Sequence, residues 1–214
     1  MDRIPKLIFI KIINFINLIY LVNLNLTNIF LKNNSKNKIN LNKKIFENIV
    51  KKYSKNIFQI IAWAKDEDII KFAITSGLFN INIFATDNTT PLMAASYHGN
   101  TFAMKLLINY CSSNTINNYD NEGNTALWLA SSNNKKDSVK ELLKYNNLNL
   151  NCQDVMGKTA LWIASACGNI DVVTILLDKK VKNIKDSGGR SALDIANLLA
   201  QEKVAEILKK NKYY

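Results

Sequence analysis

Four segments of the chain align without gaps in one twelve-residue frame, and this internal repeat constrains the fold more than any other feature. The letters that the segments share are mainly Asp, Gly, Thr, Leu and Ala, which are not the residues in greatest excess in this chain. Segments that recur every 32 to 35 residues indicate a solenoid, in which similar units stack and bury a common core. The anchoring hydroxyl residues, spaced by 35, 34 and 32 positions, are Thr90, Thr125, Thr159 and Ser191.

Each unit predicts a short helix followed by a second, apolar helix. The Thr or Ser can act as the N-cap of the first helix, because its oxygen accepts from first-turn amides. The Leu two residues later and the Ala five residues later fall on one helical face, and the small Ala lets a neighbouring helix approach. A break near Gly99, Asn134 and Gly168 separates the two helices. Residues 148–151 alternate apolar and polar side chains, which predicts a half-buried extended strand.

These units resemble the ankyrin repeat family, in which a β-turn and two antiparallel helices recur about every 33 residues with Thr-Pro-Leu-His-x-Ala at the first helix. Residues 90–95 read Thr-Pro-Leu-Met-Ala-Ala, the closest copy in the chain. The pairs Gly99-Asn100 and Gly168-Asn169 match the family's turn between helices. The resemblance covers about residues 57–210 and implies an all-α solenoid with β-turn loops.

The units depart from the family pattern at two positions of the motif. The family's Pro is Ala in three units, and its loop-bracing His is replaced throughout, which implies that these units depend more on packing. The recurrence of Trp favours packing over a binding hot spot. The first clear loop lacks the Asp, with Asp87 and Asn88 in its place, so we expect that loop to be irregular. The residues at the His position are Met93, Trp128, Trp162 and Asp194.

The repeat frame gives the predicted domain boundaries. Residues 85–118, 119–152 and 153–185 are predicted ankyrin repeats, and 186–214 a C-terminal capping repeat with a basic tail. Residues 57–84 lack the Thr anchor, as is usual for a terminal repeat, and are predicted to be a degenerate capping repeat. Residues 32–56 form a basic polar linker, in which apolar residues at a helical period from position 41 indicate an extra helix.

Residues 1–31 are predicted to be a signal peptide or membrane anchor. Residues 12–31 contain no charged side chain, and 14 of the 20 are apolar, which is long enough to span a bilayer. Arg3, Lys6 and Lys11 precede them, as is typical of a secretory signal or signal anchor, and the absence of Ala and Gly favours an uncleaved anchor. The alternative is a soluble extension whose apolarity reflects the Ile-rich composition. We therefore expect a membrane-anchored or secreted protein, with the cytoplasm as the alternative.

The net charge of +11 lies mostly ahead of the repeats. Residues 1–56 hold 11 Lys and Arg against 2 acidic residues, a net +9, whereas residues 57–214 sum to +2. The segment 32–44 offers Lys and Asn without aromatic residues or Arg, so we expect no specific nucleic-acid binding. Asn, Ile and Lys make up 85 of the 214 residues, an excess that AT-rich codons would also produce.

The sequence offers no set of residues typical of catalysis. His98 is its single His, and its three Cys lack the close spacing of a zinc site. The chain contains no glycine-rich phosphate loop, and the Asp that recurs once per unit at a turn indicates a structural role. We therefore expect no enzyme activity, no cofactor and no metal. The cysteines are Cys111, Cys152 and Cys167.

The resemblance implies recognition of another protein on a concave surface, through the loop tips and the exposed face of each first helix. The favoured hypothesis is a scaffold that is membrane-tethered or exported, and the alternative is a soluble cytosolic inhibitor or assembly subunit. Apolar residues at exposed positions are the strongest candidates, namely Val155, Met156 and Cys167. The full set of partner-binding candidates is Thr86, Asp87, Thr89, Tyr97, His98, Asn121, Glu122, Asn124, Val155, Met156, Lys158 and Cys167, with Ser132, Asn133 and Ala166 beside them.

Overall fold

The computed structural model of the protein describes residues 84–110 and 115–213. These residues belong to one compact unit, residues 55–214, of the two into which the chain divides. The predicted anchor at 1–31, the linker at 32–56 and all of the degenerate repeat at 57–84 except its last residue lie outside the described residues. Within the described part, no helix is both long enough and apolar enough to cross a bilayer.

The described residues form short helices and no strand, so the all-α solenoid expected from the sequence is confirmed for this part of the chain. Four pairs of helices follow one another, each pair separated from the next by a loop. The helices are α5 (Pro91–His98), α6 (Thr101–Tyr110), α7 (Ala126–Ser132), α8 (Lys136–Leu142), α9 (Ala160–Ala166), α10 (Ile170–Asp178), α11 (Ala192–Leu198) and α12 (Glu202–Lys210), with a 3-10 turn, η1 (Thr115–Asn117), after α6.

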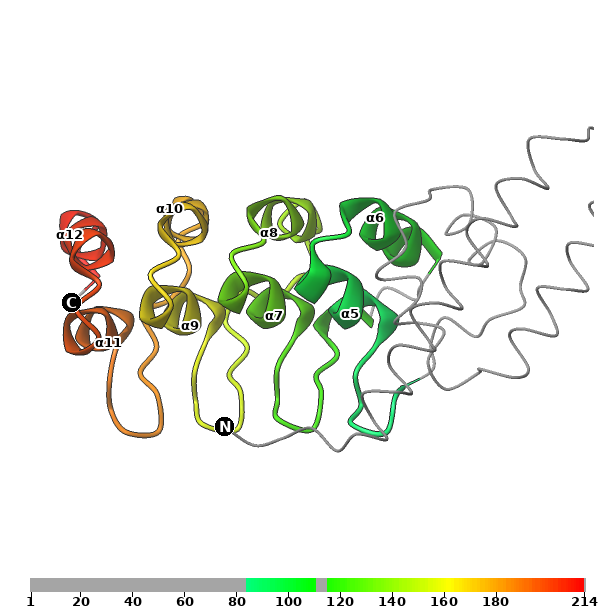
Figure 1. The fold of residues 1–214 in the computed structure, drawn as a ribbon, viewed down its shortest axis with the longest axis horizontal. Helices are drawn as coiled ribbons and strands as arrows, with labels where there is room; N and C mark the ends of the chain where they lie inside the picture. Colours follow the sequence, from blue (N-terminus) through cyan, green and yellow to red (C-terminus); the bar gives the residue numbers. More distant parts are fainter. Residues whose placement is uncertain (1–83, 111–114, 214) are drawn as a thin grey trace, which may run out of the picture. The chain divides into compact units, whose positions relative to one another are not determined.

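The helix pairs stack into two rows (Figure 1). The first helix of each pair, α5, α7, α9 and α11, forms an inner row in which each helix packs on the next. The second helices, α6, α8, α10 and α12, form an outer row above it, and the loops lie below the inner row (Figure 1). Each unit therefore contacts mainly its neighbours in the sequence, as expected of a solenoid.

The core lies between the two rows and follows the predicted positions. The Leu of each motif is at most 7% exposed, and the Ala five residues after the hydroxyl is fully buried in all four units. Ala at this position lets adjacent inner helices approach closely, because its side chain adds little bulk. The outer helices complete the core with residues that include Leu107, Val139, Leu142, Leu176 and Leu208.

The predicted N-caps are confirmed in all four units. The hydroxyl of Thr90 accepts a hydrogen bond from the amide of Met93 at 3.2 Å, and Ser191 accepts from Asp194 at the same distance. Thr125 and Thr159 make the equivalent bond to the third residue of α7 and α9. One motif position therefore fixes where each inner helix begins.

The recurring Asp has the structural role expected of it. Oδ1 of Asp186 accepts hydrogen bonds from the amides of Gly188 and Arg190, and Asp120 and Asp154 each accept the same two bonds in their loops. Burial raises the pKa of Asp186, but the hydrogen bonds and the Arg190 guanidinium, 2.9 Å from Oδ2, lower the pKa by more, so it lies below its usual value. Each Asp thus closes its loop with its own carboxylate.

The first loop keeps the regular backbone although it lacks this Asp, so the expectation that it is irregular is wrong. The amide of Ala85 donates to the carbonyl of Thr89, and that of Asn88 to the carbonyl of Ala85, as in the other three loops. Asn88 has a φ of 62° at the position that Gly takes in the others. Asn tolerates this left-handed conformation better than most residues, which explains how the turn survives.

A ladder of backbone hydrogen bonds joins the tips of consecutive loops. The amide of Asn121 donates to the carbonyl of Asp87, that of Val155 to Glu122, and that of Ser187 to Met156, each at 2.9 Å. Every bond links equivalent positions of neighbouring units. The loops are therefore held in one regular row, although each is connected only to its neighbours.

The strand predicted at residues 148–151 does not form. Leu148 is buried and Asn149 exposed, as the alternation suggested, but the segment is a turn in which the amide of Leu148 donates to the carbonyl of Tyr145. Asn117 of the preceding unit holds this turn, because its side chain bonds the carbonyl of Asn147 and the amide of Asn149. A strand needs a partner strand, and the described residues provide none here.

The two Trp residues at the family's His position differ in burial and in their contacts. Trp162 is 5% exposed, and its Nε1 donates to the carbonyl of Arg190 in the following loop at 3.2 Å, which confirms a packing role. Trp128 is half-buried, and its buried Nε1 has no partner among the described residues. In α11 the equivalent position is the exposed Asp194, and the exposed Asn197 takes the place of a buried Ser. The side of α11 that carries these two residues is therefore polar.

Candidate functional site

The candidate site is the inner face of the array, which we define as the loop tips together with the exposed side of the inner helices. Side chains seven and eight residues after each capping hydroxyl lie at the end of the inner helix, two helical turns beyond the capping residue. The loops continue this face below the inner row (Figure 1). Four similar units therefore present four copies of the same set of positions.

The loop-tip candidates are exposed and follow one another along the ladder. The ladder bonds place Asp87 beside Asn121 and Glu122 beside Val155, so the predicted residues from three loops form one continuous row. The side-chain amide of Asn88 also donates to Asn121 Oδ1 at 2.8 Å. Val155 is 68% exposed and Met156 53% exposed, although both are apolar. The exposed candidates in this row are Thr86, Asp87, Asn121, Glu122, Val155 and Met156.

The candidates that immediately precede the capping residues differ in exposure. Asn124 is 4% exposed, and its amide donates to the carboxylates of Asp120 and Glu122, so it offers little surface to a partner. Thr89 is half-buried, and its amide is held by Asp87 Oδ1 at 3.0 Å. These residues stabilise the loop from within.

Lys158 and Arg190 place positive charge close to the ring of Trp162. The Nζ of Lys158 lies 5.1 Å from the centre of the Trp162 ring, and the Arg190 guanidinium lies 6.0 Å from it. Both distances are within the range of a cation–π interaction. Arg190 is also paired with the buried carboxylate of Asp186, whereas Lys158 has no ion pair among the described residues. Lys158 is therefore the cation of this pair that can meet a carboxylate of a partner.

Tyr97 and His98 form the helix-end part of the face in the first described unit. Both are exposed, Tyr97 at 42%, and their rings meet edge to face with centroids 4.9 Å apart. Partial burial and the nearby charge of Lys135 lower the pKa of His98 below its usual value. The His98 ring is consequently neutral at pH 7, and this part of the face is aromatic and uncharged.

Cys167 takes the position of His98 in the third unit, eight residues after the capping Thr159, and it is exposed. Partial burial raises the pKa of its thiol, and that of Cys152, so both are thiols at neutral pH. The helix-end positions of the second unit are the half-buried Ser132 and Asn133, and Ala166 is half-buried beside Cys167. The chemistry of these positions is therefore polar in the second unit and apolar in the third.

Leu198 and Leu199 belong to this face and were missed by the sequence reasoning. Leu198 is 66% exposed and Leu199 49% exposed, at the end of α11. They lie seven and eight residues after Ser191, the same offsets that Tyr97 and His98 have from Thr90. The repeat register could have found them, because extending the chosen offsets to the fourth unit leads to these two leucines.

The character of the inner face changes along the array. The first two units present Asp87, Asn121 and Glu122 at their loop tips, whereas the third presents Val155 and Met156. The helix ends are aromatic in the first unit and polar in the second, and the fourth unit ends in two exposed leucines. The second half of the face thus combines an apolar loop tip in the third unit with an apolar helix end in the fourth, beside Lys158 and Arg190. Large exposed apolar groups indicate an interaction surface.

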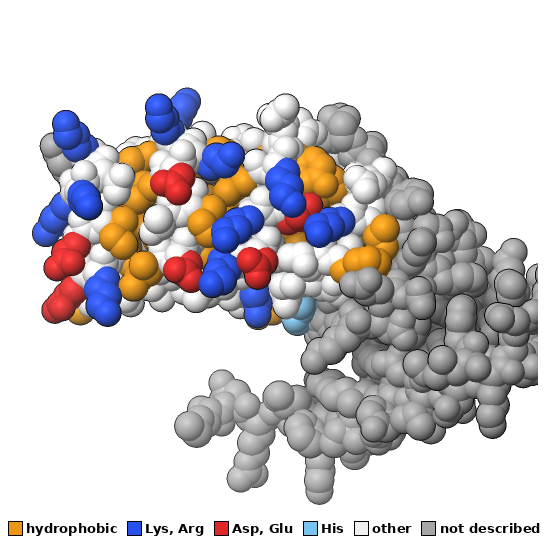
Figure 2. Space-filling view, turned by 90° about the horizontal axis from the view of Figure 1, so that it is seen from above, with side chains coloured by type: hydrophobic (Ala, Val, Ile, Leu, Met, Phe, Trp, Pro, Cys, Tyr) orange, Lys and Arg blue, Asp and Glu red, His pale blue; other side chains and the backbone are white. Residues whose placement is uncertain are grey.

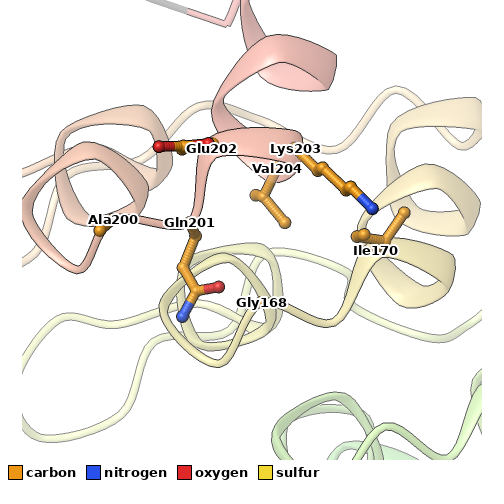
Figure 3. Close-up of a pocket in the computed structure, with 7 residues that line it drawn as sticks. All are labelled: Gly168, Ile170, Ala200, Gln201, Glu202, Lys203 and Val204. Carbon is orange, nitrogen blue, oxygen red and sulfur yellow. The ribbon is translucent and has the colours of Figure 1, made fainter.

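A small open pocket lies outside this face, at the turns between the inner and outer rows (Figure 3). Gly168 and Ile170 line one side of the pocket, and residues 200–204 line the other. The side chain of Gln201 points towards Gly168 (Figure 3), where a Cβ would lie 2.2 Å from its Oε1. Its Nε2 donates to the carbonyl of Ala166, so this contact joins two units. Asn169, at the same position of the preceding unit, donates to Ser131 and Ser132 in the same way.

Comparisons with known proteins agree with this geometry. A family model described as ankyrin repeats (3 copies) matches residues 57–154 and again residues 146–214. The first match includes residues 57–84, for which the sequence predicts a degenerate repeat. A search of curated proteins gave no match. In the described residues, no group of three or more His, Cys, Asp or Glu side chains lies close enough to hold a metal ion.

Proposed function

The chain belongs to the ankyrin repeat family, and from this premise we propose that it is a non-catalytic scaffold that binds another protein on the inner face of its stack. Ankyrin repeat proteins are in general interaction modules rather than enzymes. The observation that carries the proposal is the exposure of large apolar side chains at a loop tip of the third unit and at the helix end of the fourth. These side chains are Val155, Met156, Leu198 and Leu199.

The partner-binding residues that we propose follow from this surface. Val155, Met156 and Cys167 supply apolar contacts in the third unit, and Leu198 and Leu199 extend them into the fourth. The loop tips and helix ends of the first two units add polar and aromatic contacts. The face therefore offers both the apolar and the polar contacts that protein interfaces combine.

A single added charge among the exposed apolar side chains of the face tests this proposal. The partner is first identified by proximity labelling around the full chain, and its affinity is then measured with purified proteins. We expect Met156→Glu and Leu198→Glu each to weaken binding about thirtyfold, because a buried interface residue contributes about 2 kcal/mol and a buried unpaired charge opposes binding. Thr174→Glu is the matched control, since Thr174 is exposed on the outer helix α10 and changes the net charge equally. Equal weakening by all three variants would contradict the proposal.

We also propose that residues 1–31 tether the scaffold to a membrane or direct its export. The support is the uncharged stretch at 12–31 with basic residues ahead of it. The competing proposal is a soluble cytosolic inhibitor or assembly subunit with the same fold. The two proposals predict different locations of the full-length chain, in the membrane fraction or in the soluble fraction.

Fractionation of the tagged full-length chain and of a variant lacking residues 1–31 distinguishes these proposals. The tether predicts that the full-length chain remains with membranes through a high-salt wash, because hydrophobic insertion is insensitive to salt, and that the shortened chain is released. If both chains are equally soluble, the tether is ruled out and the cytosolic scaffold is favoured.

A further inference from the structure

Lysine side chains gather where the outer helices end. Because consecutive outer helices pack side by side in one row, their C-terminal ends lie along one edge of the array (Figure 1). Figure 2 looks down on the outer row, and Lys and Arg side chains project from the upper edge of the view towards the end at which α12 lies. We call this the lysine edge and define it as Lys140, Lys144, Lys179, Lys180, Lys182, Lys209, Lys210 and Lys212.

The lysine edge has little compensating negative charge. All eight of its lysines are exposed. The acidic residues in the same segments, 140–146, 176–182 and 207–213, are Glu141 and Asp178. Glu141 is buried and already paired with Lys144 at 2.6 Å, so Asp178 is the remaining exposed carboxylate of these segments.

This charge is not a uniform consequence of the Lys-rich composition. The loops on the other side of the array, residues 84–90, 118–125, 152–159 and 184–191, carry five carboxylates and three cationic side chains. Lysine introduced by coding bias alone would be spread over all exposed positions. A few lysines at a helix C-terminus also compensate the helix dipole, but Lys182 and Lys212 lie beyond the last helical residue. The segregation of charge therefore calls for a partner of opposite sign.

We propose that the lysine edge is a docking surface for anionic lipid headgroups. Lys is a compact point charge that meets phosphates without demanding a fixed geometry, whereas specific nucleic-acid contacts favour Arg, which these segments lack. A lipid surface also matches the extended, linear form of the edge, since many weak contacts add along it. The loops lie on the opposite side of the array from the outer row (Figure 1), so the inner face stays accessible to its protein partner.

Matched lysine variants of the full chain test the proposal with vesicles of 70% phosphatidylcholine and 30% phosphatidylserine. The edge variant combines Lys179→Gln, Lys209→Gln and Lys210→Gln. The control variant combines Lys105→Gln, Lys185→Gln and Lys203→Gln, which are exposed elsewhere and remove the same charge.

The expected result is a large difference between the two variants. Each lysine near an anionic surface strengthens binding about fivefold, so we expect the edge variant to bind the vesicles at least tenfold more weakly than the control. The residues ahead of the array are identical in both variants and contribute equally. Pure phosphatidylcholine vesicles should bind both variants alike. Equal binding of the two variants to the anionic vesicles would overturn the proposal.

A footprint on the unmodified chain gives a second readout that does not depend on variants. Lysines are acetylated with and without vesicles, and the rate at each residue is measured by mass spectrometry. We expect slower acetylation of Lys179, Lys180, Lys209 and Lys210 on anionic vesicles, and an unchanged rate at Lys105. High salt should remove the protection, because the attraction is screened. Unchanged rates at the edge, or protection by duplex DNA but not by vesicles, would contradict the lipid assignment.

Discussion

Replacing Gly157 by Ala is expected to lower the free energy of unfolding by about 3 kcal/mol. Gly157 has a φ of 76°, and an L residue in this left-handed region loses about 1–2 kcal/mol. A Cβ would also lie 2.8 Å from the backbone nitrogen of Ser187 in the next loop, and forcing a shift in a packed contact costs a further 1–3 kcal/mol or so. The shift would strain the ladder bond from Ser187 to Met156.

Gly189 provides the control, because it takes the same position of the following loop. Its φ is 77°, but a Cβ there would meet nothing within 4 Å. We therefore expect Gly189→Ala to cost about 1 kcal/mol, from the conformation alone. Urea unfolding of both variants, followed by circular dichroism, measures the difference. Equal losses would show that the close approach between loops does not contribute to stability.

Replacing Trp162 by Ala is expected to lower the free energy of unfolding by about 4 kcal/mol, because this large side chain is only 5% exposed and contacts the loop of the following unit. The loss includes the contact with two cations and the hydrogen bond to the Arg190 carbonyl. The same urea measurement gives the value. A loss below about 1 kcal/mol would mean that the unit does not depend on this residue for its stability.

Phe substitutions separate the hydrogen bond from the packing. Trp162→Phe removes the Nε1 bond to Arg190 and should cost about 1 kcal/mol beyond the change in size. Trp128→Phe removes an Nε1 that is buried without a partner among the described residues, and so removes a desolvation cost. It should therefore lower the free energy of unfolding by about 1 kcal/mol less than Trp162→Phe does. Equal effects of the two substitutions would imply that Trp128 Nε1 bonds water.

The repeat register was predictable because it depends on local chemistry. The capping hydroxyls, the buried Leu and Ala positions and the loop Asp act within their own unit, so a single sequence contains the information. The strand expected at 148–151 failed for the opposite reason. Alternation reports which side chains are buried, but a strand also needs a neighbouring strand, and here Asn117 holds the segment as a turn.

The sequence predicted which repeat positions form the candidate site, but not which side chains at those positions are exposed. The offsets from the capping hydroxyl placed Val155 and Met156 correctly on exposed loop tips, but Asn124, the candidate directly before the capping Thr125, is buried by bonds to Asp120 and Glu122. Whether a polar side chain turns inwards depends on which carboxylates lie near it in space. Leu198 and Leu199 were missed although they have the same offsets from Ser191 that Tyr97 and His98 have from Thr90.

The polar side of α11 has a consequence for assembly. The third unit has the buried Trp162 and Ser165 at these two positions, whereas α11 has Asp194 and Asn197, which are exposed to water. The Asp194 carboxylate is already bonded to the amide and hydroxyl of Ser191. A second molecule stacked on this end would have to dehydrate that charge, with no indole to fill the gap. The polar side of this helix pair therefore opposes end-to-end stacking of two such arrays.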